Sequence, residues 1–129
     1  MENNNTLWLS AWEMKSKAYA PYSGFSVGAA VQTQDGMVFS GCNVENSSFG
    51  LTSCAERNAI YAAVASGRTD LLVLAVAGSE TDPTFPCGAC RQVMKEFGIE
   101  SVVIGTPKRQ RVYALNELLP EAFERRHIK

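Results

Sequence analysis

Residues 54–77 read CAERNAIYAAVASGRTDLLVLAVA, and this stretch decides the fold. Its first half, residues 54–65, is rich in alanine, has helical periodicity and is followed by Gly67, a residue type common at helix ends. Its second half, residues 71–77, is an almost continuous apolar run, as expected of a strand that is buried on both faces. A helix followed by a buried strand predicts an α/β protein.

The same pattern recurs downstream, and a hairpin precedes it. Residues 86–97 predict a second helix, and residues 100–105 (ESVVIG) predict another buried strand. Upstream, the Asp-Gly pair at 35–36 predicts a tight turn between strands at 25–33 and 37–43. Together these elements predict a mixed sheet with helices on both faces.

The two ends of the chain are more weakly patterned. Thr6 is placed to cap a helix that runs to about Tyr19. Residues 115–123 predict a short turn of helix, and the charged residues 124–129 predict a frayed tail. No internal repeat, linker or low-complexity tract interrupts the sequence, so we expect a single domain over residues 1–129.

The composition excludes several classes of protein. With 46% hydrophobic and 19% charged residues, the chain of 129 residues is too apolar for intrinsic disorder. It has no uncharged apolar stretch of roughly 18–20 residues that could span a membrane, and residues 1–5 lack the basic start and apolar core of a signal peptide. A formal net charge of −1 disfavours binding to polynucleotides. We therefore expect a cytoplasmic protein whose partners include neither membranes nor long nucleic acids.

Three of the four cysteines occupy equivalent positions in the predicted topology. Cys54 begins one predicted helix, and Cys87 and Cys90 begin the next. In a chain without an export signal, such cysteines indicate metal ligands or reactive thiols rather than disulfides. Three thiolates on one ion, with water in the fourth position, are the arrangement of catalytic zinc. We expect Cys42, on a strand, to be a small buried apolar residue, and His127, the single histidine, to be exposed in the tail.

Charged residues beside these cysteines indicate their chemistry. Glu56 lies two residues after Cys54 and, since the core contains no histidine, is the expected proton shuttle. Zinc bound by three thiolates has a net charge of −1, which would weaken its ability to acidify water. We expect Arg57 and Arg91, each within about one helical turn of a cysteine, to donate to the sulfurs and offset that charge.

These patterns leave several alternatives open. The Cys-x-x-Cys pair alone would also fit a redox site like that of thioredoxin, which leaves Cys54 and Glu56 without a role. A structural zinc site would need Cys42 or His127 as a fourth ligand. Glu56 could simply complement a helix dipole, and the two arginines could be surface or interface residues.

Four ordered segments carry a more specific signal: APYSGFSVGAA (20–30), GCNVEN (41–46), CAER (54–57) and PCGACRQ (86–92). They resemble the motifs of the small homotetrameric cytidine deaminases of pyrimidine salvage. The resemblance extends from the first predicted helix to Leu-Leu-Pro at 118–120, which is nearly the whole chain. It implies a three-layer α/β fold with a mixed five-stranded sheet.

The same resemblance implies the chemistry of the site. One Zn²⁺ per chain would be bound by Cys54, Cys87 and Cys90, with Glu56 as the proton shuttle. The reaction would be the hydrolytic deamination of cytidine and deoxycytidine to uridine and deoxyuridine, with release of ammonia. Glu56 would pass protons to N3 of the base and then to the leaving amine.

The resemblance also implies how the nucleoside is bound. Asn43 and Glu45 would form hydrogen bonds with the ribose hydroxyls, Phe25 would pack on the base, and Ala55 would contact the substrate. Three further residues would reach the pocket of a neighbouring subunit, so that the homotetramer shares its active sites: Ser47, Phe49 and Phe123.

Two positions depart from the family pattern. Phe49 stands where tyrosine is frequent, and Phe85 stands where serine commonly precedes Pro-Cys. Deaminases of nucleoside antibiotics share the Cys-x-Glu and Pro-Cys-x-x-Cys motifs. The Asn-Val-Glu-Asn segment at 43–46 and Arg57 favour the nucleoside enzyme over these relatives.

Overall fold

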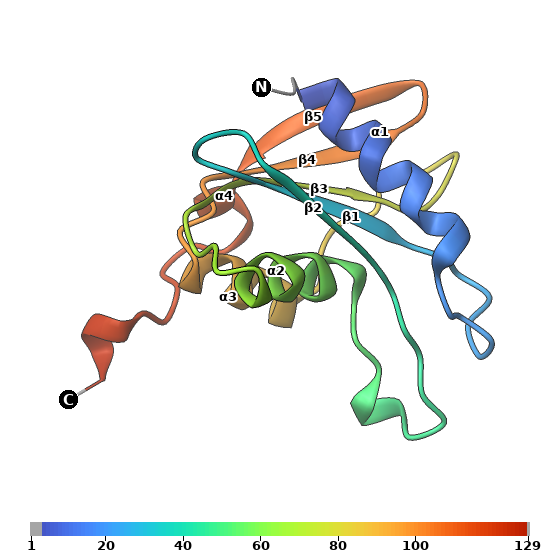
Figure 1. The fold of residues 1–129 in the computed structure, drawn as a ribbon, viewed down its shortest axis with the longest axis horizontal. Helices are drawn as coiled ribbons and strands as arrows, with labels where there is room; N and C mark the ends of the chain where they lie inside the picture. The colour runs from blue at the N-terminus through green and yellow to red at the C-terminus, as the bar shows by residue number, and fades with distance from the viewer. Residues whose placement is uncertain (1–3, 129) are drawn as a thin grey trace.

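A five-stranded sheet forms the middle layer of the protein (Figure 1). The computed structural model describes residues 4–128, so the first three residues of the chain and Lys129 of the predicted tail lie outside the described residues. The strands stand in the order β2-β1-β3-β4-β5. Their bounds are Gly28–Thr33 for β1, Val38–Cys42 for β2, Leu71–Ala77 for β3, Ser101–Thr106 for β4 and Arg109–Ala114 for β5.

The sheet combines parallel and antiparallel pairing. β3 and β4 run parallel, with Leu74 opposite Val102, whereas the other three neighbouring pairs are antiparallel. A parallel pair requires a crossover connection, which contains the helix α3 (Gly88–Glu96). The predicted mixed sheet is confirmed, and the apolar run at 71–77 is a strand with the predicted bounds.

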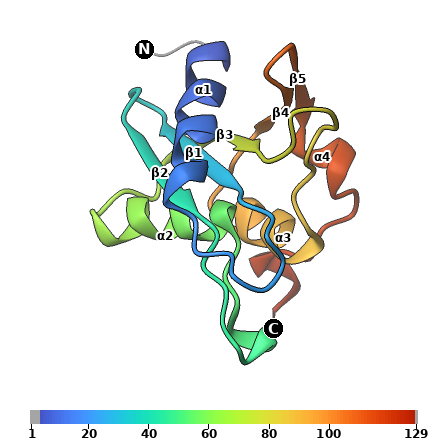
Figure 2. The ribbon, with the colours of Figure 1, turned by 90° about the vertical axis from the view of Figure 1, so that its right-hand side faces the viewer.

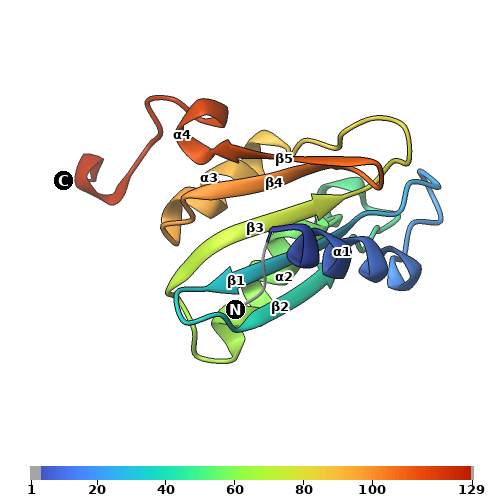
Figure 3. The same cartoon turned by 90° about the horizontal axis from the view of Figure 1, so that it is seen from above.

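Helices cover both faces of this sheet. α1 (Asn4–Met14) lies across one face, and α2 (Ala55–Ala65) and α3 lie on the other (Figure 1 and Figure 3). This arrangement confirms the predicted three-layer fold. The remaining helical segments are short: α4 (Leu115–Leu118) and the 3-10 helices η1 (Lys15–Lys17), η2 (Phe49–Leu51) and η3 (Arg125–His127). No helix in the described part of the chain has both the length and the hydropathy needed to cross a membrane.

The sheet separates two apolar clusters, because successive side chains of a strand point to opposite faces. Leu74 belongs to the cluster under α2 and α3, and Ala75 belongs to the cluster under α1. Trp8 of α1 is fully buried and donates from Nε1 to the Val76 carbonyl at 3.0 Å. This bond ties α1 to β3, the central strand.

The first helix differs in its bounds from the predicted one. It includes Asn4 and Thr6, so Thr6 lies inside the helix rather than at its cap, and it ends at Met14, followed by η1. The chain leaves the helix because its backbone pairs with the segment after β2. The Tyr19 N–H donates to the Asn43 carbonyl at 3.0 Å, which requires an extended conformation at Tyr19.

The first strand is shorter than predicted at its start. It begins at Gly28 rather than at residue 25, because a side chain binds the backbone before it. Asn43 Oδ1 accepts from the Val27 N–H, and Asn43 Nδ2 donates to the Phe25 carbonyl, both at 2.9 Å. These bonds replace the ladder that would have continued the strand.

The strand patterns of the sequence did not locate β5. Its residues, RQRVYA, contain few apolar side chains, and Val112 is 45% exposed while Tyr113 packs on the core. An edge strand with one solvated face needs little hydrophobicity, so its apolar signal is weak. The fifth strand was expected from the family resemblance alone.

The charged tail forms a short 3-10 turn where fraying was predicted. Glu124 forms an ion pair with Lys95 of α3, with 3.3 Å between Oε1 and Nζ. This ion pair connects the tail to α3. His127 is exposed, as predicted, and its Nδ1 accepts from the Glu124 N–H at 2.9 Å.

Two segments extend beyond the layered body. The arm, residues 43–54, runs from β2 to α2 by way of η2, and the C-terminal segment, residues 119–128, follows α4. Figure 1 and Figure 2 show the arm projecting well beyond the helical layer, and Figure 1 shows the C-terminal segment leaving the body on another side. Both segments are therefore available for contacts outside the chain.

Candidate active site

The N-terminal ends of α2 and α3 bring three cysteines together. Cys54 and Cys87 are the N-cap residues of these helices, and Cys90 is fully buried in the first turn of α3. Gly41 of β2 allows α2 to lie close to the sheet, since a Cβ at this position would lie 2.4 Å from the Ala59 backbone nitrogen. The close packing of α2 thus fixes the position of Cys54 relative to α3.

The three sulfurs form a triangle of the size that a zinc ion needs. The distance between Sγ atoms is 3.9 Å from Cys54 to Cys87 and 3.5 Å from Cys87 to Cys90. A tetrahedral zinc ion with Zn–S bonds of about 2.3 Å holds its sulfurs about 3.8 Å apart. Neither N-cap side chain caps its own helix, so both sulfurs can face the ion.

The site offers three protein ligands rather than four. Within residues 4–128, the His, Cys, Asp and Glu side chains grouped closely enough to hold a metal ion are Cys54, Cys87 and Cys90. Cys42 and His127 lie outside this group, which argues against a structural zinc site with four protein ligands. Cys42 is half-buried rather than fully buried as predicted, because β2 is an edge strand. A zinc ion on three thiols keeps one position for water, as in catalytic sites.

Arg57 provides positive charge beside the sulfurs. Its Nη2 donates to Cys54 Sγ at 3.3 Å. A hydrogen bond with the Cys90 thiol, together with the bond from Arg57, lowers the pKa of Cys54 to about 5. The metal-binding thiolate form of Cys54 is therefore favoured. The Nε atom of Arg57 is buried and has no hydrogen-bond partner among the described residues.

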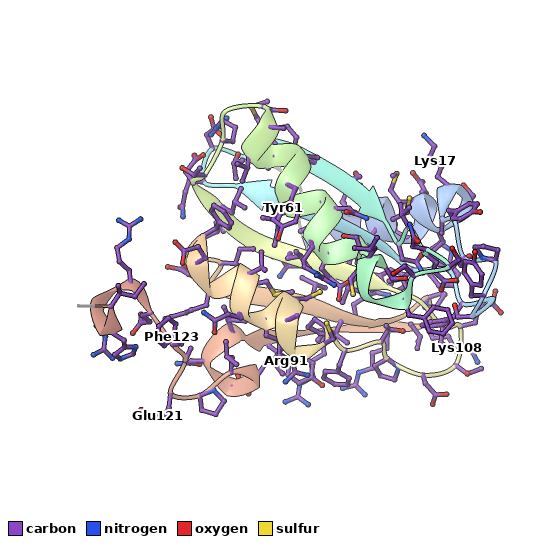
Figure 4. The ribbon with its side chains drawn as sticks, turned by 90° about the horizontal axis from the view of Figure 1, so that it is seen from below. Lys17, Tyr61, Arg91, Lys108, Glu121 and Phe123 are labelled. Atoms are coloured by element: carbon purple, nitrogen blue, oxygen red, sulfur yellow. The ribbon has the colours of Figure 1, made fainter. Side chains whose placement is uncertain are left out.

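Arg91 does not donate to sulfur in the way the sequence suggested. Its Nε donates to the Pro86 carbonyl at 2.8 Å, and its Nη1 donates to the Leu118 carbonyl at 2.7 Å. The reason is its place on α3, from which the side chain reaches back along the segment before the helix and across to α4. Figure 4 shows Arg91 on the side of α3 that lies away from α2.

Glu56 places a carboxyl group next to the thiols. It lies in the first turn of α2 and is 4% exposed. Burial raises the pKa of Glu56 to about 7, and the Cys54 thiolate acts in the same direction, whereas Arg57 opposes the shift. A carboxyl group with a pKa near neutrality can both accept and release a proton at physiological pH.

Asn43 is buried and organises the residues before β1. Because its amide binds both Phe25 and Val27, as described above, it holds the backbone that presents the Phe25 ring. The Phe25 side chain itself is 45% exposed, although its pattern is that of a strand residue. The structure thus leaves this ring accessible to a ligand.

Glu45 is bound by the turn that follows η1. Its Oε1 accepts from the Tyr22 N–H at 2.9 Å and from the Ser23 N–H at 3.1 Å, and its Oε2 accepts from the Ser23 hydroxyl. These bonds, that of the Ser23 hydroxyl most of all, lower the pKa of Glu45. The motif residues Tyr22 and Ser23 therefore hold this carboxylate in place, a role that the sequence did not reveal.

The residues predicted to serve a neighbouring subunit are exposed. Phe49, at the tip of the arm, is 74% exposed and touches the Tyr22 ring edge-on, with 6.0 Å between ring centroids. Phe123 is 58% exposed in the C-terminal segment, and Ser47 is exposed in the arm. Ala55, by contrast, is fully buried at the start of α2.

Gly78 limits the space beside the Phe25 ring, a feature that sequence reasoning missed. A Cβ at this position would lie 2.4 Å from Thr84 Oγ1 and 2.7 Å from Cζ of Phe25. Lys15 Nζ donates to the Gly78 carbonyl and connects this backbone to η1. The Phe25 ring thus packs against a backbone position where a side chain has no room. A glycine directly after a buried strand was the one available signal.

Comparison with known proteins identifies the family. The sequence model described as "Cytidine and deoxycytidylate deaminase zinc-binding region" matches residues 1–106. The chain belongs to this family. The deaminase region is zinc-binding, and the matching residues include the three clustered cysteines, so the predicted zinc cofactor is confirmed.

Relatives of this deaminase family resemble the chain over most of its length. Cytidine deaminase from Halalkalibacterium halodurans is 45% identical over 116 residues, which cover 88% of each chain. Cytidine deaminase from Mycobacterium tuberculosis is 45% identical over 119 residues, or 92% of this chain and 88% of the relative.

Solved structures of cytidine deaminases show the same fold. The enzyme from Burkholderia pseudomallei superimposes with a TM-score of 0.88 at 47% identity and covers 95% of this chain and 100% of its own. The Mycobacterium tuberculosis enzyme has a TM-score of 0.82 at 44% identity, with 95% and 98% of the chains covered. The deaminase fold predicted from the four sequence segments is therefore confirmed.

Proposed function

We propose that this protein catalyses the zinc-dependent hydrolytic deamination of cytidine and deoxycytidine to uridine and deoxyuridine, with release of ammonia. The observation that carries the proposal is the buried carboxyl of Glu56 in the helical turn that follows Cys54, beside three clustered thiols. Zinc deaminases of bases require this combination of a metal with an open position and a glutamate that does not bind the metal. The similar relatives named cytidine deaminase support the choice of substrate.

Each charged group of the site has a role in this proposal. Zinc held by Cys54, Cys87 and Cys90 would supply the Lewis acidity that makes a water molecule nucleophilic. Glu56 accepts a proton from that water at its carboxylate, and it delivers protons to N3 of the base and then to the leaving amine. Arg57 offsets the negative charge of the thiolates through its contact with Cys54 Sγ.

The nucleoside would lie between the metal site and the segment that Asn43 and Glu45 organise. We propose that the exposed Phe25 ring packs on the base. Ala55, the first residue of α2, would contact the substrate from that helix. The sugar hydroxyls would bind Asn43 and Glu45. A hydroxyl of the ribose can join the Ser23 hydroxyl on Glu45 Oε2, because a carboxylate oxygen accepts more than one hydrogen bond.

The direct test is to follow the absorbance of cytidine and deoxycytidine after the purified protein is added, with zinc content measured in parallel. Loss of cytidine absorbance that depends on about one bound zinc per chain is expected. Reduction of insulin disulfides without deamination would favour the redox alternative, and tightly bound zinc without turnover would favour a structural role.

The wider biological assignment follows from the same activity. We propose a single deaminase domain over residues 1–129 that acts on free nucleosides in the cytoplasm, as part of pyrimidine salvage. The net charge of −1 supports a small-molecule substrate rather than a polynucleotide.

We further propose that the active form is a homotetramer with shared active sites. The arm and the C-terminal segment support this, because each exposes large apolar side chains in a single chain. The exposed fraction is 74% for Phe49, 71% for Leu51 and 58% for Phe123. Such residues stabilise a protein when another chain covers them. In this proposal Ser47, Phe49 and Phe123 reach the pocket of a neighbouring subunit.

Mixing two defective variants tests the shared sites. Glu56→Gln lacks the proton shuttle and Phe123→Ala lacks the neighbour's ring, so each should be poorly active alone. Random co-assembly of equal amounts gives about a quarter of the sites an intact Glu56 and an intact neighbouring Phe123, and activity should rise accordingly. Sedimentation of the wild type should show about 56 kDa, the mass of four 14.0 kDa chains.

The control for this experiment is Ile128→Ala, which removes another exposed apolar side chain from the same tail. It should keep activity on its own. An active monomer, or mixtures that gain no activity over their separate components, would show that each pocket is built within one chain.

Gly78→Ala should weaken nucleoside binding while the chain still folds. The added methyl group meets the ends of the Phe25 and Thr84 side chains rather than backbone, so those side chains shift and the ring leaves its position. We expect KM for cytidine to rise roughly 10-fold, since crowding of this kind costs about 1–3 kcal/mol, with a smaller change in kcat. A KM for cytidine equal to that of the wild type would contradict the proposed contact of Phe25 with the base.

A further inference from the structure

We propose that Phe85 and Tyr113, together with Arg91, form a clamp that positions Cys87 and slows the loss of zinc. This inference rests on the proposed function, because it concerns the same metal site. Phe85 occupies the position at which the sequence departs from the family pattern, directly before Pro-Cys. The clamp assigns a function to that departure.

Cys87 needs support from outside its own element. It is exposed, whereas Cys90 is fully buried and Cys54 is half-buried. It also follows residues 78–86, which form neither helix nor strand. A ligand at the end of such a connection would lose backbone freedom on binding an ion, and that entropy loss would weaken the metal site.

An aromatic contact fixes the residue two positions before Cys87. The Phe85 ring meets the Tyr113 ring edge-on, with centroids 5.4 Å apart and planes at 67°. The Arg111 guanidinium lies over the Tyr113 ring at 4.5 Å from its centroid. Tyr113 therefore receives an edge-on ring and a cation, both of which are favourable contacts for an aromatic side chain. β5, which lies on the far edge of the sheet, thus holds the connection that leads to the metal.

Arg91 fixes Pro86, the residue between Phe85 and Cys87. Its bond to the Pro86 carbonyl and its bond to the Leu118 carbonyl connect this segment to α4. Pro86 has a restricted φ angle, and proline also restricts the residue before it, here Phe85. Residues 85–87 are consequently held by a ring contact, by proline geometry and by an arginine bridge, and the Cys87 sulfur is presented in place before the ion arrives.

The clamp can be tested through zinc release rather than through activity. Phe85→Ala and Tyr113→Leu each remove one half of the ring contact, and a chromogenic chelator reports the rate at which zinc leaves. Because residues that support metal ligands typically change metal affinity by 10–100-fold, we expect each variant to release zinc at least about 10-fold faster than the wild type. The double variant should be no faster than the faster single variant by more than about twofold, since both substitutions break the same contact.

Controls separate this effect from a general loss of stability. Val112→Ala shortens an exposed side chain on the other face of β5 and should release zinc at the wild-type rate. Tyr113→Phe keeps the ring and should also behave as the wild type. In cobalt-substituted protein, Phe85→Ala should change the thiolate-to-cobalt absorption bands, which a merely less stable fold would leave unaltered.

The outcomes distinguish the clamp from the site itself. Zinc release within twofold of the wild type in Phe85→Ala and Tyr113→Leu would overturn the clamp, as would an equal acceleration in Val112→Ala. Failure of the wild type to bind zinc would instead overturn the proposed metal site. If Tyr113→Leu fails to fold, Phe85→Ala decides alone, because that side chain is 44% exposed and its loss leaves the core intact.

Discussion

Glu56→Gln should lower kcat for cytidine by about 10²–10⁴ while leaving zinc content unchanged. The amide has nearly the shape of the carboxylate, so the first turn of α2 and the adjacent thiols keep their packing. It cannot take a proton from water or deliver one to N3 of the base. The variant should still bind cytidine, because the sugar and ring contacts lie on other residues.

Three measurements check this prediction: turnover by absorbance, zinc by elemental analysis and cytidine affinity by calorimetry. Glu13→Gln is the matched control, since it makes the same chemical change at an exposed position of α1, on the opposite face of the sheet. Turnover near the wild-type level in Glu56→Gln would remove this residue from the mechanism. Loss of zinc in Glu56→Gln would indicate that the carboxyl helps to bind the metal.

The central strand of the fold could be predicted because burial on both faces alone sets its sequence pattern. Residues 71–77 lie between two helical layers, so nearly every side chain must be apolar, and the run is visible directly. The helix at 54–65 is almost as clear, and the structure moves its start by one residue, to Ala55. The connections to these two elements carry Cys54 and Cys87, which explains why position and spacing alone marked the three cysteines as candidate metal ligands.

The segments around the substrate region could not be predicted in the same way. Side chains rather than strand pairing organise them: Asn43 binds the backbone near Phe25, and Glu45 binds the turn at Tyr22 and Ser23. Bonds of this kind join residues about 20 positions apart and leave no periodic signal. The family resemblance assigned both polar residues to the sugar, and the structure adds that they also hold the backbone at residues 22–27.

Arg91 shows the limit of reasoning from helical spacing. Its position one residue after Cys90 predicted a contact with sulfur, and its place on α3 turns the side chain toward two carbonyl groups instead. Spacing fixes which residues lie near one another, but rotamers and available acceptors decide which atoms meet. Arg57, in contrast, lies three residues after Cys54 on the same helix, and its guanidinium reaches the sulfur.

A second large effect is expected from replacing the cysteines of the cluster. Cys54→Ser, Cys87→Ser and Cys90→Ser should each lose most of the bound zinc, because each removes one of three protein ligands and a serine hydroxyl is a poor substitute for a thiolate. Deamination should fall by more than about 100-fold, the upper range for changes that affect a metal ligand only indirectly. Removal of zinc from the wild type with a strong chelator should give the same loss, and added zinc should restore activity to the wild type but not to these variants.

Cys42→Ser is the matched control for this series. Cys42 lies on β2 outside the cluster, and the contact that involves it uses its backbone carbonyl, which accepts from Asn58 Nδ2 at 2.7 Å and survives the substitution. Zinc content and turnover should therefore stay close to the wild type. Full zinc occupancy in any of the three cluster variants, or loss of zinc in Cys42→Ser, would show that the ligand set has been assigned wrongly.

Because the cluster cysteines differ in burial, thermal unfolding of the zinc-free forms should be compared as well. Cys87→Ser, at the exposed position, should then show the loss of zinc with the least change in the zinc-free fold.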